Sequence, residues 1–217
     1  MAADLARAGP ADPAERRGHA LGGLLAGREA QAAAAADLLC RAAGEADCAG
    51  RVLAAANVAL PASAAADGSS QDSGLARLWQ AATVLREHRG DGHFAALAAA
   101  DIDGCEAVVL RCGLDLRRED MQPIRGWTDE QWAGAHARLA DRGWVGAGGK
   151  LTSAGRQAHA AVEAATDRAA ARPWARLGAE TADELATLLT PLAQACAASM
   201  PYPSPVGVPV PGSGAGR

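Results

Sequence analysis

The stretch GWTDEQWAGAHARLADRGWVGAGGKLTSAGR, residues 126–156, decides the fold of this chain. Thr128 and Gln131 stand three residues apart at its start, a spacing typical of a capping box, in which each side chain bonds the other residue's backbone amide. We therefore expect a helix over residues 129–142, ended by the glycine that follows it. Two short extended pieces joined by glycines come next, and they predict a small β-hairpin at about Trp144–Thr152.

A further helix is expected to begin at Ser153, so the predicted order is helix, hairpin, helix, which is the order of a winged helix-turn-helix. Aromatic residues make up only 3% of the chain, and much of the apolar content is alanine, the strongest helix former. We predict a mainly α fold: a winged helix-turn-helix with one small β-hairpin as its wing and with additional N- and C-terminal helices.

Clusters of proline, glycine and serine suggest how the chain is divided. The predicted segments are a helical N-terminal segment at 1–60, a flexible linker at 61–74, a winged-helix domain at 75–178, a C-terminal helix at 179–200 and a Pro/Gly-rich tail at 201–217. The linker and the tail are expected to be mobile, because their composition cannot bury enough apolar surface to offset the entropy of ordering.

Composition limits the classes of function. A net charge of −4 at pH 7 does not favour a nucleic-acid binder, which usually shows a basic footprint. No apolar segment is long enough to span a bilayer and no secretory leader is recognisable, so we expect a cytoplasmic protein that does not act at membranes. An odd number of cysteines without a CxxC pair predicts reduced thiols that are mostly small core residues: Cys40, Cys48, Cys105, Cys112 and Cys196.

The segment REHRGDGH, residues 86–93, concentrates ionisable side chains in an alanine-rich chain. The structural interpretation is that the two glycines break a helix and that Asp91 caps the next one. The functional interpretation is that the histidines and arginines converge at this bend to hold a small anionic or polar ligand. On that interpretation the ligand-binding residues of the segment are Arg86, His88, Arg89, Asp91 and His93.

Glu163, Thr166 and Asp167 can share one face of the helix after the hairpin. They are either a solvated face or, if that helix packs near residues 86–93, part of an arginine–carboxylate network in which Glu163 and Asp167 join the ligand site. The histidine spacing fits no standard metal site, so neither a metal nor a cofactor is expected. No nucleophile stands at a recognisable spacing, and the sequence assigns no catalytic residue.

A winged helix binds DNA by placing one helix in the major groove and its wing against phosphates. Here the groove helix would be residues 129–142, which begins with two acids, and the wing offers a single cation. Charge therefore does not support DNA binding, although the fold is most often used for it. The candidate DNA-contacting residues are Gln131, Arg138, Arg142 and Lys150.

The chain also resembles a known family through several sequence motifs that occur in the same order. They are LWQAATVLREHRGDGHFAAL, RGWTDEQW, ARLADRGWV, LTSAGR, EAATDRAAARPWARLG and PSPVGVP. Over about residues 50–209 the chain resembles an actinobacterial family of MarR-like helix-turn-helix proteins, relative to which its N-terminal segment is shortened. The resemblance implies a winged-helix fold and dimerisation through terminal helices. It implies no activity.

We therefore expect a MarR-like, ligand-responsive transcriptional regulator, with double-stranded DNA and a small anionic or polar ligand as partners. The alternative is a small-molecule-binding protein or an enzyme that uses residues 86–93 on a winged-helix scaffold. A homodimer is expected because the last helix carries an apolar stripe that is unsuited to water. The stripe consists of Leu185, Leu188, Leu189 and Leu192.

Overall fold

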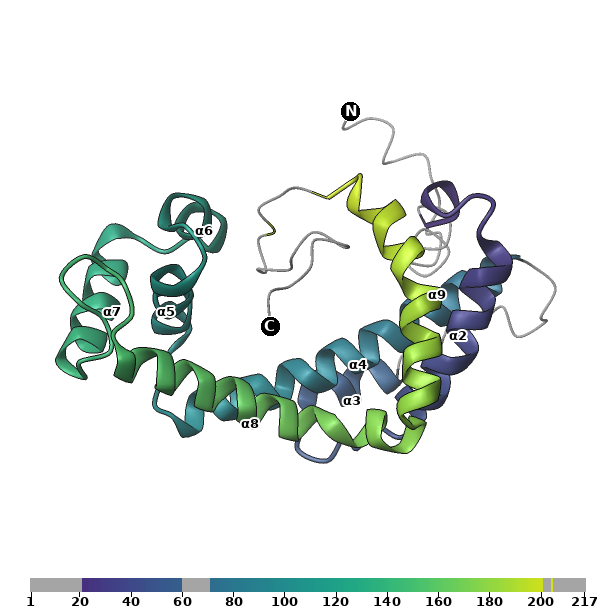
Figure 1. The fold of residues 1–217 in the computed structure, drawn as a ribbon, viewed down its shortest axis with the longest axis horizontal. Coiled ribbons are helices and arrows are strands. Elements are labelled where there is room, and N and C mark those ends of the chain that lie inside the picture. Colours follow the sequence, from purple (N-terminus) through teal and green to yellow (C-terminus); the bar gives the residue numbers. More distant parts are fainter. Residues whose placement is uncertain (1–20, 60–70, 201–203, 205–217) are drawn as a thin grey trace. The chain divides into compact units, whose positions relative to one another are not determined.

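A computed structural model describes residues 21–59, 71–200 and Ser204, and within them it is almost entirely helical. Figure 1 labels the helices in chain order. Their bounds are α2 Glu29–Gly44, α3 Val52–Ala59, α4 Gln71–Ala99, α5 Gly104–Leu114, α6 Arg118–Arg125, α7 Asp129–Asp141, α8 Ser153–Leu177 and α9 Ala179–Ala197. The mainly helical prediction is confirmed.

The chain divides into two compact units. Among the described residues, the first comprises 21–59, 71–88 and 171–199, and the second comprises 89–170 with Met200 and Ser204. Both divisions fall inside long helices, α4 and α8, so each of these helices contributes to both units. The winged-helix domain expected from the sequence at residues 75–178 stays a prediction.

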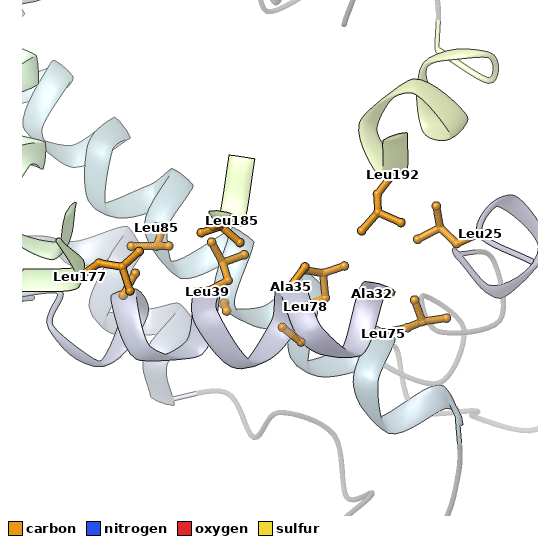
Figure 2. Close-up of a cluster of buried hydrophobic side chains, with 13 residues drawn as sticks. Leu25, Ala32, Ala35, Leu39, Leu75, Leu78, Leu85, Leu177, Leu185 and Leu192 are labelled. Atoms are coloured by element: carbon orange, nitrogen blue, oxygen red, sulfur yellow. The ribbon is translucent and has the colours of Figure 1, made fainter. Parts of the chain in front are cut away.

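Alanine and leucine build the core of the first unit, where α2 packs against α9. Four alanines of α2 are fully buried, and their small side chains let the neighbouring helices approach closely. Figure 2 shows leucines of α4 and α9 gathered around this helix. Leu185 and Leu192 of the predicted dimer stripe are buried here, within the chain itself. The stripe is therefore not a reason for a second copy to bind, and the homodimer stays a prediction without it.

The second unit holds a three-helix arrangement in which α5 packs against both α6 and α7. The capping box of Thr128 and Gln131 begins α7 as predicted, and Trp132, Ala135 and Leu139 form the buried face of this helix. Helix α6 was not predicted. Its eight residues include a proline and several charges, and this is shorter than the window of about 11–18 residues over which helical periodicity is recognised.

The hairpin region contains one isolated antiparallel bridge, between Val145 and Leu151. Gly146 N donates to Lys150 O at 2.9 Å, and Thr152 N donates to Trp144 O at 2.9 Å. These bonds close a tight turn, but no longer strand forms in the parts of the chain that the structure describes. The wing as a β-hairpin therefore stays a proposal.

The predicted helix break within residues 86–93 is wrong. Helix α4 continues through Gly90 and Gly92, and Asp91 lies inside it instead of capping a new helix. Two glycines in a helix interior cost about 2 kcal/mol relative to alanine. Packing on both sides outweighs this cost, because Leu85 is buried before the glycines and Leu97 after them.

Two predicted segments fall largely outside the described residues. Of the linker expected at 61–74, residues 61–70 lie outside them, whereas 71–74 are the first turn of α4. Of the tail expected at 201–217, only Ser204 lies within them. All five cysteines are free thiols, and Cys105 is the buried one. No helix in the described part of the chain is both long and apolar enough to cross a membrane.

Candidate functional site

The second unit brings α4 and α8 together through Arg89. Its Nη2 donates to Glu163 Oε2 at 3.1 Å and to Asp167 Oδ1 at 3.3 Å. Glu163 and Asp167 are one helical turn apart, so a single guanidinium can bridge both carboxylates. Of the two alternatives that the sequence left open, the arginine–carboxylate network is the one present, and Arg89 is the arginine of residues 86–93 that joins it.

His93 extends this cluster toward the interior. Its Nδ1 lies 3.0 Å from Thr166 Oγ1 and 3.9 Å from Glu163 Oε1. Thr166 is fully buried, and its hydroxyl donates to the carbonyl oxygen of Val162 at 2.9 Å. A hydroxyl has one proton, so Thr166 Oγ1 must accept from His93. The neutral imidazole therefore carries its proton on Nδ1 and leaves Nε2 as an acceptor.

A small cleft of about 50 Å³ opens beside His93. Its floor is apolar, and its polar lining combines His93 with His159, Glu163 and Arg111. The apolar lining residues are Leu97, Ile102, Ala107, Leu110 and Val162. Sequence reasoning missed His159 and Arg111. His159 stands four residues before Glu163 on α8, and that spacing is the signal that could have linked the two.

Burial controls the charge of this cleft. It lowers the pKa of both His93 and His159, and the neighbouring Glu163 carboxylate only partly offsets the effect. Both imidazoles are therefore neutral near pH 7. Arg111 is held by Asp115, to which its Nε and Nη2 donate at 3.0 and 2.9 Å. Neutral imidazoles, a carboxylate and a neutralised guanidinium together make the cleft richer in acceptors than in free cations.

The other residues expected to bind the ligand do not line this cleft. Arg86 is exposed and pairs with Glu87. His88 is buried in the first unit, where its carbonyl oxygen accepts from Arg51 Nη1 at 2.6 Å. Asp91 is half-buried within α4. Successive side chains of a continuous helix point in different directions. Arg86, His88 and Asp91 therefore do not converge with Arg89 and His93 as they would at a bend.

The four candidate DNA-contacting residues differ in how far they are engaged within the chain. Gln131 Oε1 accepts from the Thr128 amide in the capping box. Arg138 donates to Glu106 at 2.8 Å and to Asp103, and Glu106 is buried.

Arg142 donates to Asp101 Oδ2 at 2.8 Å and stacks over the Trp144 ring. Lys150 is exposed and has no acidic partner among the described residues.

In the described ranges no group of three or more histidine, cysteine, aspartate or glutamate side chains is placed to hold an ion.

The chain was compared with known proteins by family, by sequence and by structure. No curated protein and no solved structure matches it. A family model described as a helix-turn-helix family matches residues 3–203, which is nearly the whole sequence. Such families are in general DNA-binding regulators, and the chain belongs to this helix-turn-helix family.

Proposed function

We propose that this protein is a DNA-binding transcriptional regulator of the winged, MarR-like type, whose response depends on a small ligand. The observation that carries the proposal is the arrangement of α5, α6 and α7 in a chain that belongs to a helix-turn-helix family. Gly126 supports it, since its left-handed backbone (φ 72°) makes the sharp turn between α6 and α7. In this arrangement α7 would lie in the major groove and α6 would cross the phosphate backbone.

Two cations are positioned to contact phosphates. Arg125 ends α6 beside the turn, and Lys150 lies in the hairpin; both are exposed, and neither has an acidic partner in the part of the chain that the structure describes. Arg117 and Arg118 are exposed as well, but each is paired with a carboxylate. Two such cations near α7 allow only a few phosphate contacts, so we propose that one chain binds DNA with modest strength.

The outer face of α7 limits the reading of bases. Apart from Gln131 and Arg138, its exposed positions are alanines and acids, namely Asp129, Glu130, Ala133, Ala137, Ala140 and Asp141. Alanine can contact a thymine methyl but cannot hydrogen-bond a base edge, and a carboxylate is repelled by the phosphates that line the groove. Specificity would then come from few side chains, such as the amide of Gln131 and the ring of His136, and from DNA shape.

Titration with salt tests the proposal. Fragments of genomic DNA bound by the full chain should be released as salt rises, with a slope of log K against log salt of about −1.8 for two phosphate contacts per chain. Arg125→Ala and Lys150→Ala should each reduce the slope by about 0.9. The matched control is Arg41→Ala, at an exposed arginine of α2 in the first unit.

Three outcomes would contradict the proposal: no DNA binding at low salt, binding without salt dependence, or an equal loss of binding in the Arg41→Ala control.

The ligand-responsive part of the proposal is supported by the cleft beside His93. It lies in the same unit as α7, and its wall residues Ala107, Leu110 and Arg111 belong to α5, the helix on which α7 packs. A ligand that moved α5 would therefore act directly on the helix proposed to lie in the groove. A homodimer, which would place two such helices on successive half-sites, remains part of the proposal.

A further inference from the structure

We propose that the cleft formed by His93, His159 and Glu163 binds a small cation that carries N–H donors, with a short alkylammonium as the simplest example. The inference deepens the ligand site of the proposed regulator and rests on that site alone, not on DNA binding. The sequence led us to expect a small anionic or polar ligand. The proposal keeps a polar ligand but makes it a cation and excludes an anion.

The first argument is the supply of acceptors. His93 donates a hydrogen bond from its protonated Nδ1 to Thr166 Oγ1. In the neutral ring Nε2 therefore holds a lone pair and no proton. Glu163 uses Oε2 for Arg89, whereas its Oε1 lies 3.9 Å from His93 Nδ1 and accepts no hydrogen bond among the described residues. An ammonium group has donors and no acceptor, so it can satisfy both an imidazole nitrogen and a carboxylate oxygen at once.

The second argument is that the arginine lining the cleft, and Arg89 beside it, are already paired with carboxylates. Arg111, which lines the cleft, makes a bidentate pair with Asp115. Arg89 is shared by Glu163 and Asp167. In and beside the cleft these pairs contain two guanidinium groups and three carboxylates, so they carry one net negative charge while both imidazoles are neutral. An anion entering the cleft would have to displace a carboxylate from one of these pairs, whereas a cation balances the excess charge.

The third argument is size and polarity. A volume of about 50 Å³ holds a few atoms, because a single water already needs about 10–15 Å³ measured in this way. The apolar floor favours an alkyl carbon over a second polar group. A head group with one or two carbons therefore fits, and a drug-sized molecule, which needs at least about 300 Å³, does not.

Titration followed by NMR of the histidine rings tests the inference, on the full chain and without DNA. Ethylammonium, acetate and tetramethylammonium are the probes. Ethylammonium should shift the His93 and His159 ring signals saturably, with a Kd on the order of 1 mM or weaker for so small a ligand. Tetramethylammonium has the same charge but no N–H donor, so it should leave these signals unchanged. Saturation by acetate instead, or equal saturation by tetramethylammonium, would overturn the proposal.

Variants identify the binding residues. Glu163→Gln removes the negative charge and should weaken ethylammonium binding at least ten-fold, whereas Glu180→Gln makes the same change at an exposed position of α9 and should alter it less than two-fold. If Glu163→Gln fails to fold, Ala107→Leu serves in its place, since it fills the cleft without changing a charge. Ethylammonium binding that survives either variant at full strength would overturn the proposal, as would the absence of any saturable binding to the unaltered chain.

Discussion

His93 and Thr166 are joined by a hydrogen bond of 3.0 Å whose direction is fixed by a third group. Because the only hydroxyl proton of Thr166 is used in the hydrogen bond to the carbonyl oxygen of Val162, Thr166 Oγ1 accepts a hydrogen bond from His93 Nδ1. A fully buried threonine on α8 thereby sets the tautomer of a histidine on α4. The same kind of hydrogen bond from a ring N–H orients histidines in metal and acid–base sites.

Replacing Thr166 with valine tests this relationship. Thr166→Val keeps the shape of the side chain but removes the acceptor, so the Nδ1 proton of His93 loses its partner. We expect both neutral tautomers to become populated and the free energy of unfolding to fall by about 1–2 kcal/mol. The ¹⁵N shifts of the His93 ring report the tautomer, and urea denaturation reports stability.

Thr187→Val is the matched control. The Thr187 hydroxyl likewise donates to the carbonyl oxygen four residues earlier, that of Asp183. It lies exposed on α9 and makes no hydrogen bond to a histidine among the described residues. A His93 ring that keeps its proton on Nδ1 in Thr166→Val would contradict the assignment.

Stability should depend on pH through His93 and His159. Burial lowers the pKa of both groups in the folded state, so below pH 6.5 the unfolded chain takes up protons before the folded chain does. The contribution is complete above the unfolded pKa of about 6.5 and is lost as pH falls through the lowered folded pKa. Each imidazole gives a slope of at most about 1.4 kcal/mol per pH unit in this window. Urea midpoints measured from pH 8 to pH 5 give the profile.

Histidine variants separate these two groups from the rest of the chain. The double variant His93→Gln with His159→Gln should flatten the profile between pH 6.5 and 5. His136→Gln, at a histidine of α7 that does not line the cleft, is the control for the substitution itself. An unchanged slope in the double variant would show that other groups cause the pH dependence.

Signals local in the sequence predicted much of the fold. The start of α7 was predicted correctly because Thr128 and Gln131 form a capping box within four residues. Its buried face has the spacing expected of one side of a helix, with Trp132, Ala135 and Leu139 three or four residues apart. Helix propensity, by contrast, failed in α4, where Gly90 and Gly92 indicated a break. Packing between helices distant in sequence decided that position, and a single sequence does not display such packing.

The candidate site was predicted in part for the same reason. Glu163 and Asp167 were paired with an arginine because they share one helical face, and the structure brings Arg89 to both. His159 and Arg111 were missed, since their place in the cleft depends on how α5 and α8 pack. Arg86 and His88 were included because they are close to His93 in sequence, yet in a continuous helix closeness in sequence does not mean a common direction.

Gly155 is required where the hairpin joins α8. A Cβ atom at this position would lie 2.1 Å from the carbonyl oxygen of Trp144, which also accepts from the Thr152 amide. This backbone cannot move without breaking the turn, so Gly155→Ala should destabilise the protein by about 3 kcal/mol. For a chain of this size the melting temperature would fall by about 6–12 °C.

Gly134→Ala is the control for this substitution. The nearest atom to its added Cβ is the flexible end of Arg138, at 3.5 Å, and the position is inside α7. Alanine there should stabilise the helix by about 1 kcal/mol. Equal melting temperatures for the two variants would show that the hairpin does not hold Gly155 as described.

Glu130 tests whether α7 is the helix that enters DNA. It is exposed in the first turn of α7, the part of a recognition helix that comes nearest to the bases. A carboxylate about 4 Å from a phosphate is repelled by about 1 kcal/mol in water, which corresponds to a factor of about five in affinity. Glu130→Gln should therefore strengthen DNA binding about three- to five-fold at low salt, measured by fluorescence anisotropy, and the gain should shrink as salt screens the charge. Glu184→Gln, an exposed carboxylate on α9 in the first unit, is the matched control for the overall change in net charge. If both variants gain equally, the protein binds DNA through its net charge and not through α7; if neither gains, a different surface makes the contact.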